Sequence, residues 1–309
     1  MTSASRNKIL IIGSSGQVGS AFRRLLRNTG SVVYADKDSA ANSVKACDLS
    51  NARSIEALIT SEKPTVIINC AAYTAVDQAE KEEDLAMSIN AKALEVMAKA
   101  ADKINAVLIH YSTDYVFDGT GDKKWLETDK VNPVNAYGRT KLAGEVAVTS
   151  HCKQGYVFRT QWVYDNTGKN FLNTMLRFGA ERDELSVVGD QIGAPTSSDV
   201  IAAYTLKAVT KILNGKMSPG IYHLVCRGEV SWHGFAEKIF ELGRRLRLEL
   251  KVKTVKNIKS SDYPTPAARP KNSRLSLEKF EAAIGEKMPE WADALEAVMV
   301  ARGLLDKSC

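Results

Sequence analysis

The stretch that decides the fold reads Lys8-Ile-Leu-Ile-Ile12-Gly13-Ser-Ser-Gly16-Gln-Val-Gly19. A short apolar run without polar alternation is typical of a parallel strand buried on both faces. From Val18 onward, apolar side chains recur at the spacing of an amphipathic helix: Val18, Ala21, Phe22 and Leu25. A glycine-rich turn between such a strand and such a helix lets a pyrophosphate approach the free N–H groups of the helix. The stretch therefore predicts a dinucleotide-binding unit.

The next predicted strand, residues 31–35, ends at Asp36, twenty residues after Gly16. A carboxylate at this place can accept hydrogen bonds from an adenosine ribose, which favours NAD. Lys37 adjoins it and could tolerate a 2′-phosphate. The cofactor is therefore left open between NADH and NADPH.

Strands and helices continue to alternate along the first half of the chain. Further buried strands are predicted at 44–47, 65–69, 106–111 and 156–160, with helices between them. This alternation predicts an α/β fold with a doubly wound parallel sheet, Rossmann-like, over residues 1–165. The organisation changes beyond this point, so residues 166–309 are interpreted as a smaller C-terminal substrate-binding lobe. Segments near 185–225 are expected to return to the first domain.

The chemistry is predicted to lie in Ser112-Thr113-Asp114 and in Tyr137-Gly-Arg-Thr-Lys141. A helix would place the phenol of Tyr137 and the ammonium of Lys141 on one face. The cation would lower the tyrosine pKa toward neutrality, so that the phenol could exchange a proton with an alcohol or alkoxide. Thr113 follows a predicted strand, where its hydroxyl could hold the same substrate oxygen.

Composition and charge argue against several other classes of protein. The 309 residues carry a net charge of only +6, and the densest basic run, 244–259, has no aromatic residues interleaved between its cations, so nucleic-acid binding is not expected. No apolar run reaches the ~18 residues of a membrane span, and the first residues do not resemble a signal peptide. Five scattered cysteines predict free thiols in a reducing cytoplasm: Cys47, Cys70, Cys152, Cys226 and Cys309.

Motifs for metal and hydrolytic chemistry are missing from the sequence. There is no His-Glu-x-x-His, no Gly-x-Ser-x-Gly elbow and no Walker lysine loop. The four histidines lack metal-ligand spacing and are interpreted as structural: His110, His151, His223 and His233. A dinucleotide-binding half with an activated tyrosine and a substrate lobe indicates hydride transfer to or from a carbonyl.

From about Ile9 to about Val298, the sequence resembles the extended short-chain dehydrogenases and, within them, the dTDP-4-dehydrorhamnose reductases. Gly16-Gln-Val-Gly19 and Tyr137-Gly-Arg-Thr-Lys-Leu-Ala-Gly-Glu145 match the whole superfamily. More specific to the reductases are Ser112-Thr-Asp-Tyr-Val-Phe-Asp-Gly119, Asp190-Gln-Ile-Gly-Ala-Pro-Thr196 and Pro266-Ala-Ala-Arg-Pro270. Further matches are Asn69-Cys-Ala-Ala-Tyr-Thr-Ala-Val-Asp77, Arg159-Thr-Gln-Trp-Val-Tyr164, Gly168-Lys-Asn-Phe171, Ser231-Trp232, Phe235-Ala236 and Ser273.

The resemblance implies reduction of dTDP-4-dehydro-L-rhamnose to dTDP-L-rhamnose by NADPH or NADH. It implies a catalytic group of Thr113, Tyr137 and Lys141 and substrate contacts from Thr113, Asp114, Tyr137, Trp162 and, for the diphosphate, Arg269. The dinucleotide would be lined, besides Tyr137 and Lys141, by Gly13, Gly16, Gln17, Val18, Asp36, Asp48, Leu49, Ala71, Ala72 and Tyr73. It also suggests a homodimer and dependence on Mg²⁺, for which the sequence offers no ligand cluster.

Two positions depart from the family pattern beside Trp162. Gln161 stands where serine is expected, and Asp165 where glycine is expected. Both substitutions are expected to alter sugar preference without changing the hydride chemistry.

Two alternatives to the reductase stay open. The first is a sugar-nucleotide dehydratase or 4-epimerase, but the dehydratase needs a second carboxylate after Asp114, and Tyr115 stands there. An epimerase would hold NAD tightly and need no added reductant. The second is a non-catalytic nucleotide-binding partner, like the regulatory subunit of methionine adenosyltransferase; turnover on the sugar would exclude it.

Overall fold

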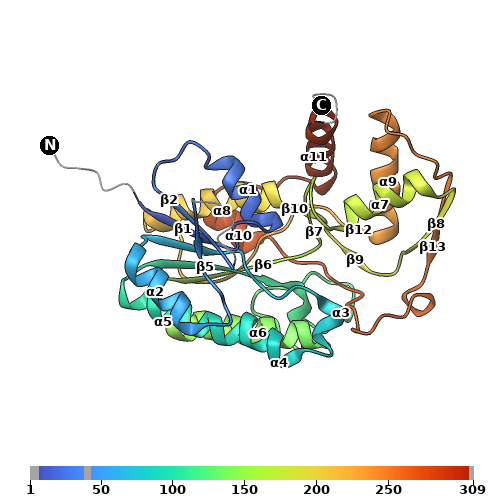
Figure 1. The fold of residues 1–309 in the computed structure, drawn as a ribbon. Coiled ribbons are helices and arrows are strands. Elements are labelled where there is room, and N and C mark those ends of the chain that lie inside the picture. Colours follow the sequence, from blue (N-terminus) through green and yellow to red (C-terminus); the bar gives the residue numbers. More distant parts are fainter. Residues whose placement is uncertain (1–6, 38–42, 306–309) are drawn as a thin grey trace.

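The computed structural model describes residues 7–37 and 43–305, and its centre is a parallel seven-stranded sheet (Figure 1). The strand order is β11-β6-β5-β4-β1-β2-β3, with every neighbouring pair parallel. The chain therefore winds outward from β1 in one direction and from β4 in the other. The strands are β1 (Ile9–Ile12), β2 (Val32–Asp36), β3 (Val44–Ala46), β4 (Val66–Asn69), β5 (Val107–Thr113), β6 (Gly155–Thr160) and β11 (Gly220–His223).

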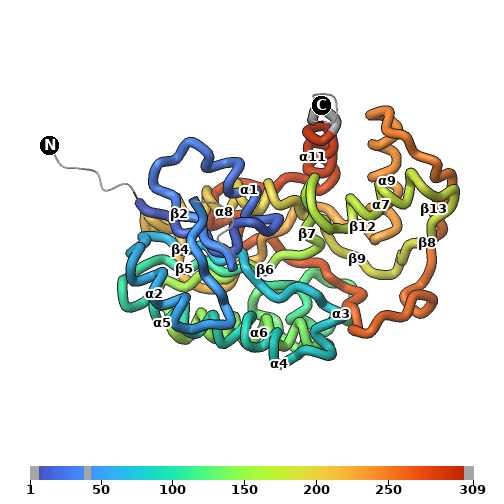
Figure 2. The backbone as a smooth tube through the Cα atoms, viewed as in Figure 1, coloured from blue at the N-terminus to red at the C-terminus, as the bar shows by residue number. Residues whose placement is uncertain are grey.

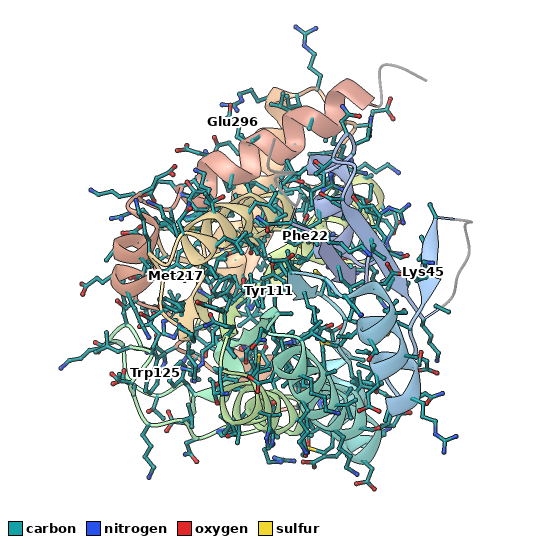
Figure 3. The ribbon with its side chains drawn as sticks, turned by 90° about the vertical axis from the view of Figure 1, so that its left-hand side faces the viewer. Phe22, Lys45, Tyr111, Trp125, Met217 and Glu296 are labelled. Atoms are coloured by element: carbon teal, nitrogen blue, oxygen red, sulfur yellow. The ribbon has the colours of Figure 1, made fainter. Side chains whose placement is uncertain are left out.

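Helices cover both faces of this sheet, because successive side chains of a strand point to opposite sides. Ile9 and Ile11 face one helical layer, whereas Leu10 and Ile12 face the other. The first layer holds α1 (Gln17–Leu25), α8 (Ser198–Leu213) and α10 (Glu278–Ile284), and Figure 3 shows Phe22 and Tyr111, both members of this core. The second layer holds α2 (Ala52–Glu62), α5 (Ala93–Lys103) and α6 (Ala136–His151). The predicted doubly wound α/β fold is confirmed.

A smaller layer lies beside the carboxyl end of the sheet and has its own apolar core, which includes Leu172, Phe235 and Leu295 (Figure 2). It is built on helices α7 (Phe171–Glu181), α9 (Trp232–Arg245) and α11 (Trp291–Leu305). Its strands are short and form pairs: β8 (Glu184–Val188) with β13 (Thr254–Ile258), β9 (Ile192–Gly193) with β12 (Val230–Ser231), and β7 (Val163–Tyr164) with β10 (Thr196–Ser197).

The chain passes between the two parts more than once. Within the expected return segment, α8 and β11 join the large sheet layer, whereas β8 pairs inside the smaller layer. Residues 266–276 run from the smaller layer to the start of α6, where the Asn135 amide donates to the Ala268 carbonyl over 2.7 Å. This crossing segment borders the site described below.

Short helices complete the chain: α3 (Val76–Ala79), α4 (Glu83–Met87), a π-helical turn (Ser88–Lys92) and two 3₁₀ turns (Asp114–Val116 and Ser260–Asp262). Four of the expected free thiols are confirmed, and Cys309 lies outside the described residues. Within 7–37 and 43–305, no helix has both the length and the apolar character needed to span a membrane.

Candidate active site

The glycine-rich turn after β1 has the shape needed to hold a pyrophosphate. Gly13 adopts φ +79°, and a Cβ on it would lie 2.5 Å from the backbone nitrogen of Ala71. Gly16 begins α1 without a side-chain hydrogen bond to cap it, so the N–H groups of the first turn stay available to a ligand. The turn lies at the point where the strand order reverses between β1 and β4, which is where open α/β sheets bind dinucleotides. These residues fit the predicted cofactor.

Asp36 and Asp48 stand at the carboxyl ends of β2 and β3, the next two strands outward. The Asp36 carboxylate accepts the Ser15 N–H at 2.7 Å and the Lys37 N–H at 2.8 Å, so it orients the glycine turn itself. Hydrogen bonds from the Ser50 N–H and hydroxyl lower the pKa of Asp48, and Leu49 beside it is buried. Both acids thus lie on the sheet edge where the sequence predicted cofactor contacts.

Ala71, Ala72 and Tyr73 follow β4. Tyr73 is fixed by Asn90, a residue that the sequence analysis did not single out. The Tyr73 N–H donates to Asn90 Oδ1 at 2.9 Å, and Asn90 Nδ2 donates to the Tyr73 carbonyl at 3.0 Å. The same amide nitrogen donates to Thr140 Oγ1 on α6 at 3.1 Å. Asn90 therefore joins the predicted cofactor loop to the helix that carries Tyr137.

Tyr137 and Thr113 come together at the end of β5. Asn135 caps α6 through the Gly138 N–H, and the Thr113 side chain lies close enough to the Tyr137 phenol to act on its pKa. The ring of Tyr115 packs edge-on against that of Tyr137, with centroids 5.8 Å apart. The predicted helix thus presents the phenol to the strand end.

The predicted lowering of the Tyr137 pKa is wrong for this structure. Burial and the nearby Asp114 carboxyl raise the pKa of Tyr137 above its ordinary value, and the Thr113 hydrogen bond offsets this only in part. The Lys141 Nζ atom instead contacts His110 Nε2 at 3.1 Å and the Tyr111 carbonyl at 2.5 Å. Burial lowers the pKa of Lys141 to about 7. The phenol is consequently held in its protonated form.

Asp114, the next residue after Thr113, is also enclosed. Its Oδ1 accepts the Thr113 hydroxyl at 3.1 Å, and Ser273 of the crossing segment lies close enough to lower its pKa in part. Burial raises the pKa of Asp114 to about 6. The sequence could not predict this shift, because part of the enclosure comes from residue 273.

Trp162 follows β6, and Arg269 lies in the crossing segment. Trp162 has a left-handed backbone with φ +47°, and its ring stacks on that of Trp232 with centroids 3.7 Å apart. Arg269 donates to Asp77 Oδ2 at 2.8 Å and lies close enough to Tyr115 to act on its pKa. A flat aromatic wall and a guanidinium are suited to a nucleotide and a phosphate, respectively.

The two departures from the family pattern have different surroundings. Gln161 is buried, and a Cβ on Gly193 would lie 2.8 Å from its Oε1. Asp165 is buried too, but its carboxylate binds Arg24 of α1 at 2.8 Å and the hydroxyl of Ser198. Asp165 therefore connects the cofactor-side helix α1 to the segment that enters the smaller layer.

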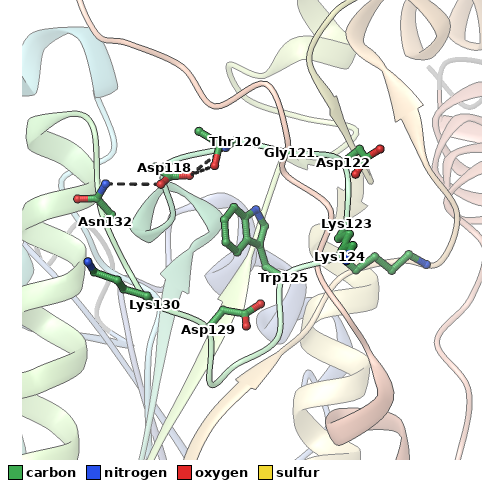
Figure 4. A pocket seen from close by; sticks show the side chains of 10 residues that line it. All are labelled: Asp118, Thr120, Gly121, Asp122, Lys123, Lys124, Trp125, Asp129, Lys130 and Asn132. Carbon is green, nitrogen blue, oxygen red and sulfur yellow. Dashed lines mark hydrogen bonds between the residues drawn. The ribbon is translucent and has the colours of Figure 1, made fainter.

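A separate pocket of about 500 Å³ opens along the 118–132 loop, and Figure 4 shows its lining. Trp125 forms one wall, and the Asp118 carboxylate accepts the N–H and hydroxyl of Thr120 at 2.9 and 2.7 Å. None of the predicted catalytic residues lines it. Across the part of the chain that the structure describes, no group of three or more His, Cys, Asp or Glu side chains is placed to hold a metal ion.

The parallel sheet, the glycine turn and the Thr113–Tyr137–Lys141 arrangement define an oxidoreductase of the short-chain dehydrogenase type. The family model described as the RmlD substrate binding domain matches residues 7–302. The chain is 44% identical to the dTDP-4-dehydrorhamnose reductase of Escherichia coli K12 over 284 residues, which is 92% of this chain and 94% of the relative. This chain belongs to the dTDP-4-dehydrorhamnose reductase family.

Solved structures agree with this assignment. A Bacillus anthracis dTDP-4-dehydrorhamnose reductase in complex with NADP is 35% identical, with a TM-score of 0.86 over 96% of this chain and 99% of the other. A Clostridium acetobutylicum dTDP-4-dehydrorhamnose reductase is 37% identical, with a TM-score of 0.85 over 95% and 99%. The expected family is confirmed.

Proposed function

We propose that this chain reduces the 4-keto group of dTDP-4-dehydro-L-rhamnose to dTDP-L-rhamnose with NADPH or NADH. The observation that carries the proposal is the meeting of Thr113 and Tyr137 at the carboxyl edge of the sheet, where Thr113 acts on the pKa of the phenol, beside a glycine turn that fits a dinucleotide. The relatives named as dTDP-4-dehydrorhamnose reductases support the substrate, and the Bacillus anthracis complex supports NADP as a cofactor.

The dinucleotide would lie along the ends of β1 to β5, and when bound it supplies the hydride for C4 of the sugar. The turn at Gly13 and Gly16 would hold the pyrophosphate with backbone N–H groups. Asp36 and Lys37 would meet the adenosine end, and Ala71 to Tyr73 the nicotinamide half. The remaining predicted cofactor contacts are Gln17, Val18, Asp48 and Leu49.

Proton transfer would be the task of Tyr137. The phenol, whose pKa is not lowered, is protonated at neutral pH and can donate to the oxygen on which negative charge develops. The O–H bond of the phenol breaks, an O–H bond forms on the sugar, and Thr113 holds that oxygen in place. Lys141 would hold the nicotinamide ribose.

The sugar nucleotide would occupy the space between the sheet edge and the smaller layer. Asp114 and Trp162 would contact it, and Arg269 would reach its diphosphate. In this scheme, residues 1–165 form the cofactor domain, and 166–309 mainly the substrate lobe. A cytoplasmic location and a homodimeric state belong to the same proposal.

The first prediction concerns Tyr137→Phe. We expect wild-type protein to oxidise NADPH, followed at 340 nm, when dTDP-4-dehydro-L-rhamnose is added. The variant should lose at least ~10²-fold in kcat because it lacks the proton donor. NADH measured in parallel gives the cofactor preference.

A measurement of cofactor binding shows whether the Tyr137→Phe variant has lost only its proton donor or the cofactor site as well. The Tyr137→Phe variant should still bind NADPH in a fluorescence titration. If wild-type protein binds the dinucleotide but oxidises none of it with this sugar, the proposal is wrong. Tightly bound NAD in the purified protein would then favour the epimerase.

A further inference from the structure

A continuous hydrogen-bonded chain runs beneath the catalytic residues, from Asn69 through His110 to Lys141. Asn69 and His110 are directly paired in the register of β4 and β5, and both side chains are fully buried. Asn69 Nδ2 lies 3.1 Å from His110 Nδ1, and His110 Nε2 lies 3.1 Å from Lys141 Nζ. The histidine was interpreted as structural from the sequence, yet it contacts a predicted catalytic residue.

The backbone determines which groups donate and which accept along this hydrogen-bonded chain. Asn69 Oδ1 accepts the N–H of Ala71 at 3.1 Å, so the amide must present its NH₂ group to His110. A ring nitrogen that faces an N–H donor has to be the acceptor, which places the single proton of a neutral imidazole on Nε2. The Nε2–H group then points at Lys141 Nζ.

Two donors cannot share one hydrogen bond. An ammonium at Lys141 would face the Nε2–H of His110 with no acceptor between them, whereas a neutral amine can accept that proton with its lone pair. The amine also donates to the Tyr111 carbonyl at 2.5 Å. The lowered pKa values of His110 and Lys141 agree with this arrangement of protons.

The inference depends on which other groups surround Lys141. From α6, Glu145 acts on Lys141. From β5, His110 and the Tyr111 carbonyl contact it, and Cys70 after β4 acts on Tyr111. Glu145 is the one of these groups that raises the pKa of Lys141. Its carboxylate is already held by Arg159 of β6 through two hydrogen bonds of 2.8 and 2.7 Å. The direct partners of Nζ are therefore His110 and the Tyr111 carbonyl.

We propose that Asn69 and His110 are positioning residues that fix the tautomer of the imidazole and thereby favour the neutral form of the Lys141 amine. Lys141 then gains its proton only as the pH falls toward neutrality. The kinetic part of this inference rests on the proposed reduction. The tautomer itself can be measured without any turnover.

The decisive variant is His110→Gln. A glutamine amide can turn its carbonyl toward Lys141 and accept a hydrogen bond from the ammonium. The substitution therefore adds no charge, but Lys141 no longer faces an N–H donor. We expect kcat/KM of wild-type protein to fall as the pH rises through the pKa of Lys141. In His110→Gln this fall should move to higher pH by about one unit.

His223→Gln is the matched control. His223 is also fully buried at a strand end, but its Nδ1 contacts the Ser276 carbonyl at 3.0 Å, not a lysine. The same substitution there should leave the pH profile in place. Melting temperatures of both variants report whether each has folded. An unshifted profile in folded His110→Gln, or an equal shift in His223→Gln, would overturn the inference.

The tautomer is read from the ¹⁵N spectrum of protein labelled at histidine, with the His110 signals assigned by their loss in His110→Gln. At pH 8, wild-type protein should show a bare Nδ1 and a protonated Nε2 at His110. In Asn69→Asp the carboxylate can accept from Nδ1–H, so the opposite tautomer is expected. A protonated Nδ1 in wild-type protein would contradict the inference even if the enzyme is fully active. Absence of turnover with the expected tautomer would reject the proposed function instead.

Discussion

At the scale of the residue, Asp114 is a carboxyl group that is almost fully buried. It is 2% exposed, and its Oδ2 has no hydrogen-bond partner among the described residues. Burial raises its pKa to about 6, against about 3.9 in an unfolded chain. The folded protein therefore binds this proton more tightly than the unfolded chain does. It follows that the ionised group opposes folding above pH 6, and that this cost disappears below about pH 4.

Asp114→Asn should accordingly stabilise the protein at high pH. We expect a gain of about 1–3 kcal/mol in the free energy of unfolding at pH 8, and almost none at pH 4. Urea unfolding at both pH values measures it. Asp118→Asn is the control: hydrogen bonds from Thr120 lower the pKa of Asp118, so its loss should not stabilise the protein at pH 8. A gain in Asp114→Asn that is equal at both pH values would argue against the buried charge as its cause.

At the scale of the element, the turn between β1 and α1 depends on the absence of a side chain at Gly13. Its φ of +79° is costly for other residues, and the space of a Cβ is already filled by Ala71. Gly121 offers a comparison, because it has a similar φ of +70° but nothing within 4 Å of a Cβ. Alanine substitutions at Gly13 and Gly121 therefore separate the effect of backbone strain from the effect of a close contact.

We expect Gly13→Ala to reduce NADPH affinity at least ~10-fold, because the Ala71 backbone must move away from the glycine-rich turn that would hold the pyrophosphate. Gly121→Ala should lower the free energy of unfolding by about 1 kcal/mol, because alanine is strained at this φ, and should leave NADPH affinity unchanged. Fluorescence titration gives the affinities, and thermal unfolding gives the stabilities. Equal NADPH affinity in the two variants would show that the contact with Ala71 is not what shapes the turn.

At the scale of the whole molecule, Asp165 joins parts of the chain that are distant in sequence. Arg24 of α1 bridges the buried Asp165 and the half-exposed Asp199 of α8. Ser198 also donates to Asp165. Arg24 and Ser198 share Asp165 Oδ2, and the Thr167 N–H donates to Oδ1. An amide at position 165 would therefore turn its NH₂ group toward one of these donors, whereas an amide at 199 would remain in contact with water.

Asp165→Asn should therefore cost about 1–3 kcal/mol of the free energy of unfolding. Asp199→Asn, at the solvent-facing end of the same arginine, should cost less than ~1 kcal/mol. Chemical denaturation of the two variants at one pH compares them directly. Similar losses in both would mean that burial of Asp165 adds nothing to the contact.

Local sequence was sufficient for much of the fold and of the site. The apolar strand before Gly13, the helix after it and the helix that carries Tyr137 and Lys141 follow from neighbouring residues, and each was predicted correctly. The pairing of Asn69 with His110 depends on strand register, and the contact of Arg24 with Asp165 joins residues 141 positions apart. The direction of the Tyr137 pKa shift was mispredicted because burial in the folded chain and the nearby Asp114 carboxyl raise it.

The repeated passage of the chain between the large sheet layer and the smaller layer limits how such a protein can be recombined. A transplant of substrate preference from a homologue cannot exchange one contiguous half, because α8, β11 and α10 complete the core of the cofactor side. A single junction near residue 165 would separate Arg24 from Asp165 or leave a sheet face uncovered. Functional chimeras of this architecture are expected to need several matched junctions, one at each passage.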